Sequence, residues 1–177
     1  MRRTRHQDGF TLIELLIVVA IIGIIAAIAV PGLLRARMSG NEASGVGSIR
    51  TISSAQSTYA SSCGSGGYAI TMAALALPPT IGGPPFIAAD LAAATAAASA
   101  KSGYFFVIQN GPTGVATTTA ANTCNGAATA PSTEFFATAT PASPGSTGSR
   151  YFATDQSGQI RQDTAPIATI AGGYPLQ

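Results

Sequence analysis

The sequence predicts an α+β fold in which a long amino-terminal α-helix carries a small antiparallel β-sheet. Three observations lead to this fold class. A mostly apolar stretch runs from Phe10 to Leu34, and apolar residues then recur at helical spacing up to about residue 60. Beyond that point the chain contains short β-branched and aromatic runs separated by turn-forming residues, which is typical of antiparallel strands. A length of 177 residues suits one globular domain with an additional segment.

The low content of charged residues has a local and a global cause. Charged side chains make up 9% of the chain, against about 25% in average soluble domains. The apolar stretch accounts for part of this deficit, and a head rich in Ala, Gly, Ser, Thr and Pro accounts for the rest. The first nine residues hold three of the nine basic and one of the seven acidic side chains, so the rest of the chain has six of each. A neutral body has no basic stripe to neutralise phosphates, so we expect no nucleic-acid binding.

The apolar stretch is long enough to cross a membrane. The 20 residues from Leu15 to Leu34 contain no charge, and a helix of that length covers about 30 Å, the thickness of a hydrocarbon core. Arg2, Arg3 and Arg5 precede it. Because basic residues stay on the cytoplasmic side, we expect a single-pass protein with a cytoplasmic amino terminus and the bulk of the chain outside.

Composition alone allows three interpretations of this segment: a signal anchor, a secretory signal peptide, or the helix of a processed filament subunit. Ala27-Ile28-Ala29 offers the small-residue site at which a signal peptide is cut. Against that interpretation, the apolar region exceeds the usual ~7 to 15 residues of a signal peptide. Glu14 is also an unusual residue for such a leader.

The stretch Gly9-Phe10-Thr11-Leu12-Ile13-Glu14-Leu15-Leu16, preceded by a short basic leader, resembles the class III signal of type IV prepilins and of type II secretion pseudopilins. The resemblance implies a pilin-like fold. It also implies that a membrane-embedded prepilin peptidase removes the leader between Gly9 and Phe10 and methylates the new amino terminus. The further partners that it implies are an inner-membrane assembly platform and other copies of the subunit. The protein would move from the bacterial inner membrane into a periplasmic or cell-surface filament.

We accordingly expect four segments. Their bounds are 1–9 for a leader that is removed, 10–34 for the transmembrane and filament-core helix, 35–60 for the amphipathic half of the helix, and 61–177 for the globular head.

Glu14 is the only charge between Phe10 and Leu34. A carboxylate in the apolar part of a membrane helix costs several kcal/mol and needs a partner, so it indicates a functional role. Cleavage after Gly9 supplies one, because the new ammonium group at Phe10 lies four residues earlier and is also present on a neighbouring helix. The resemblance implies this assembly contact between subunits. Alternatively, Thr11-x-x-Glu14 forms a capping box at the helix start.

Two features predict irregularity further along the helix. Pro31-Gly32 predicts a kink, because proline removes a hydrogen bond and clashes with the preceding turn. The resemblance implies that the helix bends or melts here on assembly. Gly40, Gly45 and Gly47 each weaken a helix by about 1 kcal/mol relative to alanine. They predict a break, after which Ser39-x-x-Glu42 would start the helix again.

One face of the helix is apolar from residue 46 onward and therefore available to pack on the head. The residues that recur on this face are Val46, Ile49, Ile52, Ala55 and Tyr59.

The head is predicted to contain an Ala-rich helix, Ala88 to Ala100, and four strands. The strands cover Tyr104 to Gln109, Glu134 to Thr140, Arg150 to Thr154 and Gln159 to Gln162. Asp155-Gln156-Ser157-Gly158 has the composition of a tight turn, so the last two strands should form a hairpin. The stretches 111–130 and 141–149 read as surface loops.

Cys63 and Cys124 are the only cysteines. Two thiols without partner ligands fall short of a structural metal site. In an exported domain we expect them to form one disulfide, which closes a loop worth roughly 4 kcal/mol in the chain-entropy description. The alternative is that they are two unpaired small apolar residues.

The sequence contains no recognisable catalytic motif, so we expect neither an enzyme nor a cofactor. The only histidine is His6, in the leader, and no nucleophile elbow, phosphate-binding loop or zinc-protease motif is present. Major pseudopilins carry calcium in a carboxy-terminal loop, for which Asp155 and Asp163 are weak candidates here. Two other functions stay open at this point. One is a pseudopilin that acts as a periplasmic piston in type II secretion, and the other is a secreted or anchored binding module that never polymerises.

Overall fold

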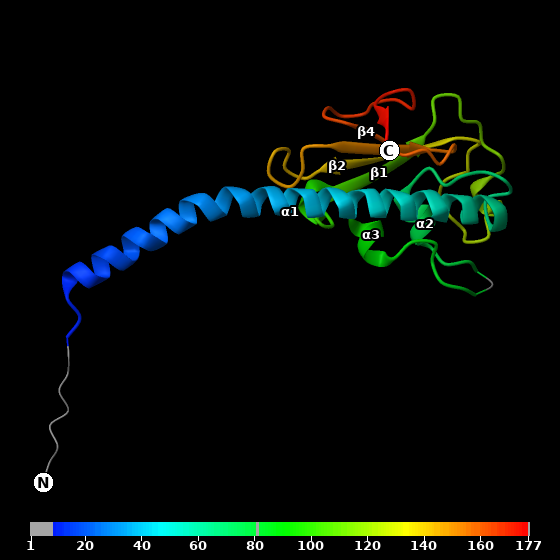
Figure 1. Cartoon of the computed structure of the whole chain (residues 1–177). Helices are drawn as coiled ribbons and strands as arrows, with labels where there is room; N and C mark the ends of the chain where they lie inside the picture. Colours follow the sequence, from blue (N-terminus) through cyan, green and yellow to red (C-terminus); the bar gives the residue numbers. More distant parts are fainter. Residues whose placement is uncertain (1–8, 81, 177) are drawn as a thin grey trace, which may run out of the picture. The chain divides into compact units, whose positions relative to one another are not determined.

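The computed structural model describes residues 9–80 and 82–176. The basic leader residues Arg2, Arg3 and Arg5 lie outside the described part of the chain. The chain divides into two compact units between Arg37 and Met38. We call residues 9–37 the stem and residues 38–176 the head, and we describe each unit by itself (Figure 1).

Helix α1 extends from Leu12 to Ser62, with Pro31 inside it. It continues through Gly40, Gly45 and Gly47, so the predicted break at these glycines is wrong, and Ser39 does not start a second helix. The physical reason is that packing of α1 in the head outweighs an intrinsic cost of about 1 kcal/mol per glycine. The kink at Pro31 and Gly32 stays a prediction.

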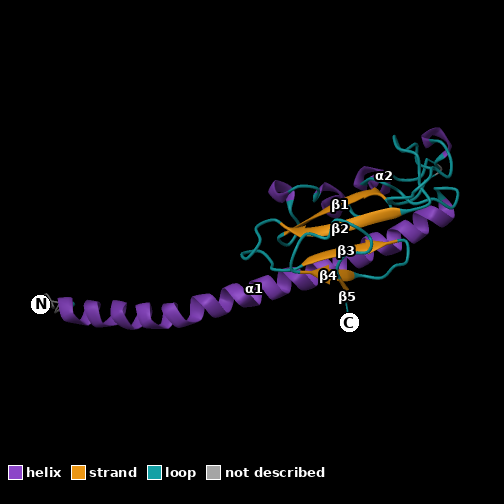
Figure 2. Cartoon of the chain, turned by 90° about the horizontal axis from the view of Figure 1, so that it is seen from above, coloured by secondary structure: helices purple, strands orange, loops and turns teal. Residues whose placement is uncertain are grey.

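The sheet of the head has five strands in the order β1-β2-β3-β4-β5, and every neighbouring pair is antiparallel (Figure 2). All four predicted strands are confirmed to within two residues at either end. The fifth was not predicted, because a two-residue strand that contains proline has no alternating pattern to detect. The bounds are Tyr104–Asn110 for β1, Phe135–Pro141 for β2, Tyr151–Asp155 for β3, Arg161–Asp163 for β4 and Tyr174–Pro175 for β5.

The predicted hairpin between β3 and β4 is confirmed. Gly158 N donates to the carbonyl oxygen of Asp155 at 3.0 Å, and Ser157 N donates to Asp155 Oδ1 at 2.8 Å. Gly158 has φ of 74°, a conformation that glycine adopts without strain. The aspartate and the glycine thus close the turn for different physical reasons.

The predicted helix from Ala88 to Ala100 is too long. Helix α3 covers only Ala89–Ala93, and a short 3₁₀ turn, η1, follows at Ala97–Ser99. The helix ends because the carbonyl oxygen of Ala94 accepts a hydrogen bond from Phe106 N at 2.8 Å, so this carbonyl bonds to β1 instead of a further helical turn. The other short helical elements are α2, Met72–Ala76, and η2, Ala120–Asn122.

The core of the head lies between the carboxy-terminal half of α1 and one face of the sheet (Figures 1 and 2). Each large apolar side chain contributes about 1.5 to 3 kcal/mol when fully buried, so this contact holds residues 38–62 of α1 in the head. Large, fully buried members of this cluster include Ile49, Ile52 and Tyr59 from α1 and Tyr104, Phe106, Phe135 and Phe152 from the sheet.

The predicted disulfide between Cys63 and Cys124 is confirmed. Cys63 directly follows the end of α1, so the bridge ties this end of the helix to the loop between β1 and β2.

Candidate processing and assembly site

The expected cleavage site lies just outside the helix. Gly9 and Phe10 are exposed, and α1 begins only at Leu12. Phe10 exposes 80% of its surface, and in the described residues nothing lies within 4 Å of the position that a Cβ at Gly9 would occupy. The Gly9–Phe10 peptide bond is therefore neither helical nor covered within the described part of the chain.

Thr11 and Glu14 form a reciprocal capping box at the start of α1. Thr11 N and Thr11 Oγ1 donate to Glu14 Oε2 at 3.0 and 2.6 Å, and Glu14 N donates to Thr11 Oγ1 at 3.3 Å. These bonds satisfy groups that a helix start leaves without partners. Both contacts to the carboxylate use Oε2. Among the described residues Oε1 accepts no hydrogen bond, so capping leaves this oxygen for a cation from elsewhere.

The stem exposes an apolar surface. By length and composition α1 can cross a membrane, and none of the residues in its most apolar window is buried. An apolar helix without a covered face needs lipid or other apolar helices around it. Side chains along the whole stretch are exposed by 45% or more, among them Leu12, Ile13, Leu16, Val19, Ile22, Ile25, Ile28, Val30 and Leu34.

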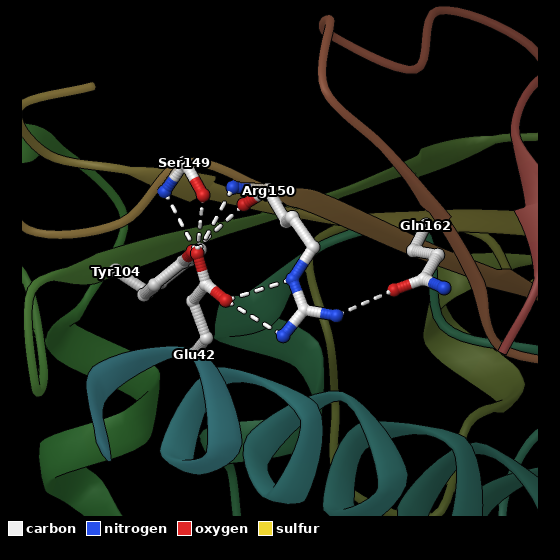
Figure 3. Close-up of polar contacts among 5 residues, drawn as sticks. All are labelled: Glu42, Tyr104, Ser149, Arg150 and Gln162. Atoms are coloured by element: carbon white, nitrogen blue, oxygen red, sulfur yellow. Dashed lines mark hydrogen bonds and ion pairs between the residues drawn. The ribbon is translucent and has the colours of Figure 1, made fainter. Parts of the chain in front are cut away.

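The head contains a second polar site, centred on Glu42 of α1 (Figure 3). Only 6% of Glu42 is exposed. Its Oε1 accepts hydrogen bonds from Ser149 N at 2.8 Å, Ser149 Oγ at 2.9 Å and Arg150 N at 3.3 Å. Its Oε2 accepts from Arg150 Nε and Nη2, both at 2.7 Å. Arg150 Nη1 donates in turn to Gln162 Oε1 at 2.9 Å, so the network reaches β4.

Opposing effects act on the pKa of Glu42. Burial raises it, but the hydrogen bonds from Ser149 and Arg150 and the charge of Arg150 outweigh burial and hold the pKa below its ordinary value. Burial, and then the negative charge of Glu42, raise the pKa of the nearby Tyr104 hydroxyl, which donates to the carbonyl oxygen of Arg150 at 2.7 Å. At neutral pH the carboxylate is therefore ionised and the phenol is protonated.

Sequence reasoning missed this role of Glu42 and placed it at a helix start instead. One signal was available. Glu42 lies three, seven and ten residues before Gly45, Ile49 and Ile52, so it falls on the same helical face as these buried residues. A carboxylate on a buried helical face requires a partner, although the pattern does not identify Arg150 as that partner.

The structure does not bring the two candidate calcium ligands together. Asp155 ends β3, whereas Asp163 pairs with Tyr151 at the start of β3, which separates them by about 13 Å along the strand. Asp155 caps its own turn, and Asp163 Oδ1 accepts from Thr164 N and Ala165 N. Across residues 9–80 and 82–176 no group of three or more His, Cys, Asp or Glu side chains is placed to hold a metal ion.

Comparison with known families identifies the amino-terminal segment. Residues 4–30 match the family described as the prokaryotic N-terminal methylation motif. The chain therefore carries a class III signal, and its long helix and antiparallel sheet are consistent with a pilin-like α+β fold.

Comparison with curated proteins gives a similar relative. The chain is 60% identical over 38 residues to the type IV wide pilus major component PilA4 of Thermus thermophilus. The match covers 22% of this chain and 29% of the relative, so the likeness extends over less than a third of either protein. No solved structure matches the chain.

Proposed function

We propose that the chain is a structural subunit of a type IV pilus or pilus-like filament. It enters the inner membrane as a prepilin, is cleaved between Gly9 and Phe10 by a prepilin peptidase and is methylated at Phe10. An inner-membrane assembly platform then moves it into the filament. The observation that carries this proposal is the methylation motif at residues 4–30, immediately followed by a helix whose apolar surface is uncovered.

The stem supports polymerisation for a physical reason. An apolar helix is stable in lipid, and it leaves lipid without a large cost only if an equally apolar environment replaces it. A bundle of identical stems provides that environment. The same segment thus serves first as a membrane span and then as the filament core.

Glu14 supplies the specific contact in this proposal. One carboxylate oxygen caps its own helix through Thr11, and Oε1 accepts the ammonium group of Phe10 on a neighbouring subunit. An ion pair in an apolar bundle is strongly favoured over an unpaired charge, so a misplaced neighbour is rejected. Cleavage is what creates the required cation, and this makes assembly depend on processing.

The pilus is favoured over the secretion pseudopilus because the similar relative is a pilus major component. A secreted or anchored binding module has less support, because cleavage at Ala29 would remove most of the stem together with the motif that the comparison identified.

The capping role and the assembly role of Glu14 can be separated by two variants. Thr11→Val removes the cap hydroxyl and keeps the carboxylate, whereas Glu14→Ala removes both functions. We expect both proteins to accumulate in the membrane, Thr11→Val to form filaments, and Glu14→Ala to form few or none in electron micrographs of whole cells. Filaments of normal number and length from Glu14→Ala would contradict the proposed contact.

A further inference from the structure

We propose that Glu42 and Arg150 are positioning residues that fix where the sheet sits along α1. The pair joins two segments 108 residues apart, one in α1 and one at the start of β3. Its role would be to hold the sheet at one register on the helix, beyond its contribution to stability.

The pair differs in its surroundings from the other ion pair among the described residues. Glu42 is the only charged residue that is buried in the described part of the chain. The side chains of Asp90 and Lys101 form an ion pair of the same length, 2.7 Å, but are 63% and 35% exposed. An exposed pair is compensated by water when it separates. The side chain of Arg150 is 43% exposed, but Glu42 is buried. If the Arg150 side chain moved away, the Glu42 carboxylate would be left buried without a cation, so separation of this pair is disfavoured.

The apolar face of α1 restricts the register by packing mainly from Ile49 onward, where Ile49, Ile52 and Tyr59 are fully buried. The buried positions nearer the stem, Gly45 and Ser48, have little or no side chain to interlock with the sheet. A displacement by one turn would move this part of the helix by about 5 Å. A hydrogen-bonded carboxylate is different, because its donors must lie within hydrogen-bond distance.

Two polar anchors stand at opposite ends of this face. At the far end Gln56, which is fully buried, donates to Ala69 O at 2.6 Å and accepts from Ala69 N at 2.8 Å. Ala69 lies only 13 residues further along the chain, so this anchor holds α1 to the loop that follows it. Glu42 lies 14 residues before Gln56, about 21 Å along the helix. Glu42 holds the first part of α1 that belongs to the head to the segment just before β3.

Neighbouring contacts shape the segment that Glu42 binds. Asn41 Nδ2 donates to Thr147 O at 2.9 Å, and Tyr104 OH donates to Arg150 O. A Cβ at Gly148 would overlap the hydroxyl oxygen of Tyr104, so only glycine fits there. The 147–150 segment is therefore held against α1 in one conformation, with the Glu42 carboxylate accepting its last two backbone N–H groups.

The functional consequence rests on the proposed filament. In a filament, the position of each sheet relative to its neighbours would depend on where the sheet packs along its own α1. A head held at one register gives every subunit the same outer surface. The anchor itself is a property of the single chain and can be tested without filaments.

The test is a distance measurement on the full-length protein in detergent micelles, by double electron–electron resonance. Spin labels are attached through a genetically encoded ketone side chain at Ser57, on the exposed face of α1, and at Ser146, in the exposed loop before β3. This chemistry leaves the disulfide intact. The variant Glu42→Leu/Arg150→Met replaces the pair with apolar residues of similar size, and Asp90→Asn/Lys101→Met removes the exposed pair as a control.

We expect one narrow distance distribution for the wild type and for the control. For Glu42→Leu/Arg150→Met we expect cooperative unfolding but a distribution at least about twofold broader, or a second population displaced by about 5 Å. A distribution as narrow as that of the wild type would overturn the proposal. If that variant does not unfold cooperatively, the same measurement on Glu42→Gln decides, and a wild-type distribution there overturns the proposal as well. Because these proteins are not assembled, the result is independent of whether the chain forms filaments.

Discussion

The buried carboxylate of Glu42 on α1 pairs at 2.7 Å with Arg150 before β3, and both of its oxygens accept hydrogen bonds. Only 9% of the residues in the chain are charged, and this pair uses two of them to link α1 to the segment before β3. Several measurable properties of the head depend on it or on the packing beside it.

Unfolding should show an acid-dependent component from Glu42. Its pKa is lowered in the folded state, so its contribution to stability is present above the ordinary value of 4.5 and is lost as pH falls through the folded pKa. We expect the free energy of unfolding to fall as pH decreases below about 5. Glu42→Gln should have a lower free energy of unfolding than the wild type at pH 7, and this free energy should fall less as the pH is lowered. Urea denaturation of the two proteins between pH 3 and 7 measures both differences.

Asp90→Asn is the control for this titration. The pKa of Asp90 is also lowered, first by its hydrogen bond with Lys101, but the carboxylate is exposed and solvent screens it. Its pH profile should follow that of the wild type. If the Glu42→Gln profile also runs parallel to the wild type, the carboxylate is not coupled to folding.

Two glycines of α1 should respond in opposite directions to alanine. Nothing lies within 4 Å of a Cβ at Gly47, so Gly47→Ala should raise the free energy of unfolding by about 1 kcal/mol. A Cβ at Gly45 would lie 3.2 Å from Tyr104 Cγ, and that ring is held by its bond to Arg150 O. In Gly45→Ala, crowding against this ring should therefore cancel the gain in helix propensity and lower the free energy of unfolding by about 1 kcal/mol.

Thermal unfolding of Gly45→Ala and Gly47→Ala side by side measures this difference. Equal stabilisation by the two substitutions would show that the Tyr104 ring moves freely, which the packing described above does not allow.

Removal of the disulfide should destabilise the head without changing its secondary structure. The bridge closes a loop of 61 residues, and Cys63→Ser/Cys124→Ser should lower the free energy of unfolding by roughly 4 kcal/mol in the chain-entropy description. Circular dichroism during urea denaturation checks this, with reduced wild-type protein as the matched sample. The variant and the reduced wild type should agree. A variant as stable as the oxidised protein would refute the structural role of the bridge.

Much of the fold follows from patterns within short stretches of sequence. The apolar run before Leu34 predicts the stem helix, and Asp155 with Gly158 predicts the β3–β4 turn. The disulfide was predictable because an exported domain with two cysteines has only one pairing available.

The parts that could not be predicted depend on contacts between distant segments. Helix α3 stops where the Ala94 carbonyl bonds to β1, and no local pattern indicates that bond. The glycines of α1 suggested a break, yet Gly45 is the residue that admits the Tyr104 ring. Arg150 as the partner of Glu42 has no signal in sequence, because 108 residues of chain lie between them.

We propose that cleavage after Gly9 converts a membrane precursor into a filament subunit, and the mass of the amino-terminal peptide is the measurement that decides this. Protein is purified from sheared surface material and from membranes of the native host, and its amino-terminal peptide is sequenced by mass spectrometry. We expect the mature chain to start at N-methylated Phe10 in the surface material and in the processed protein of the membrane fraction. A chain that begins at Met1 in the surface fraction, or one that begins at Val30, would contradict it.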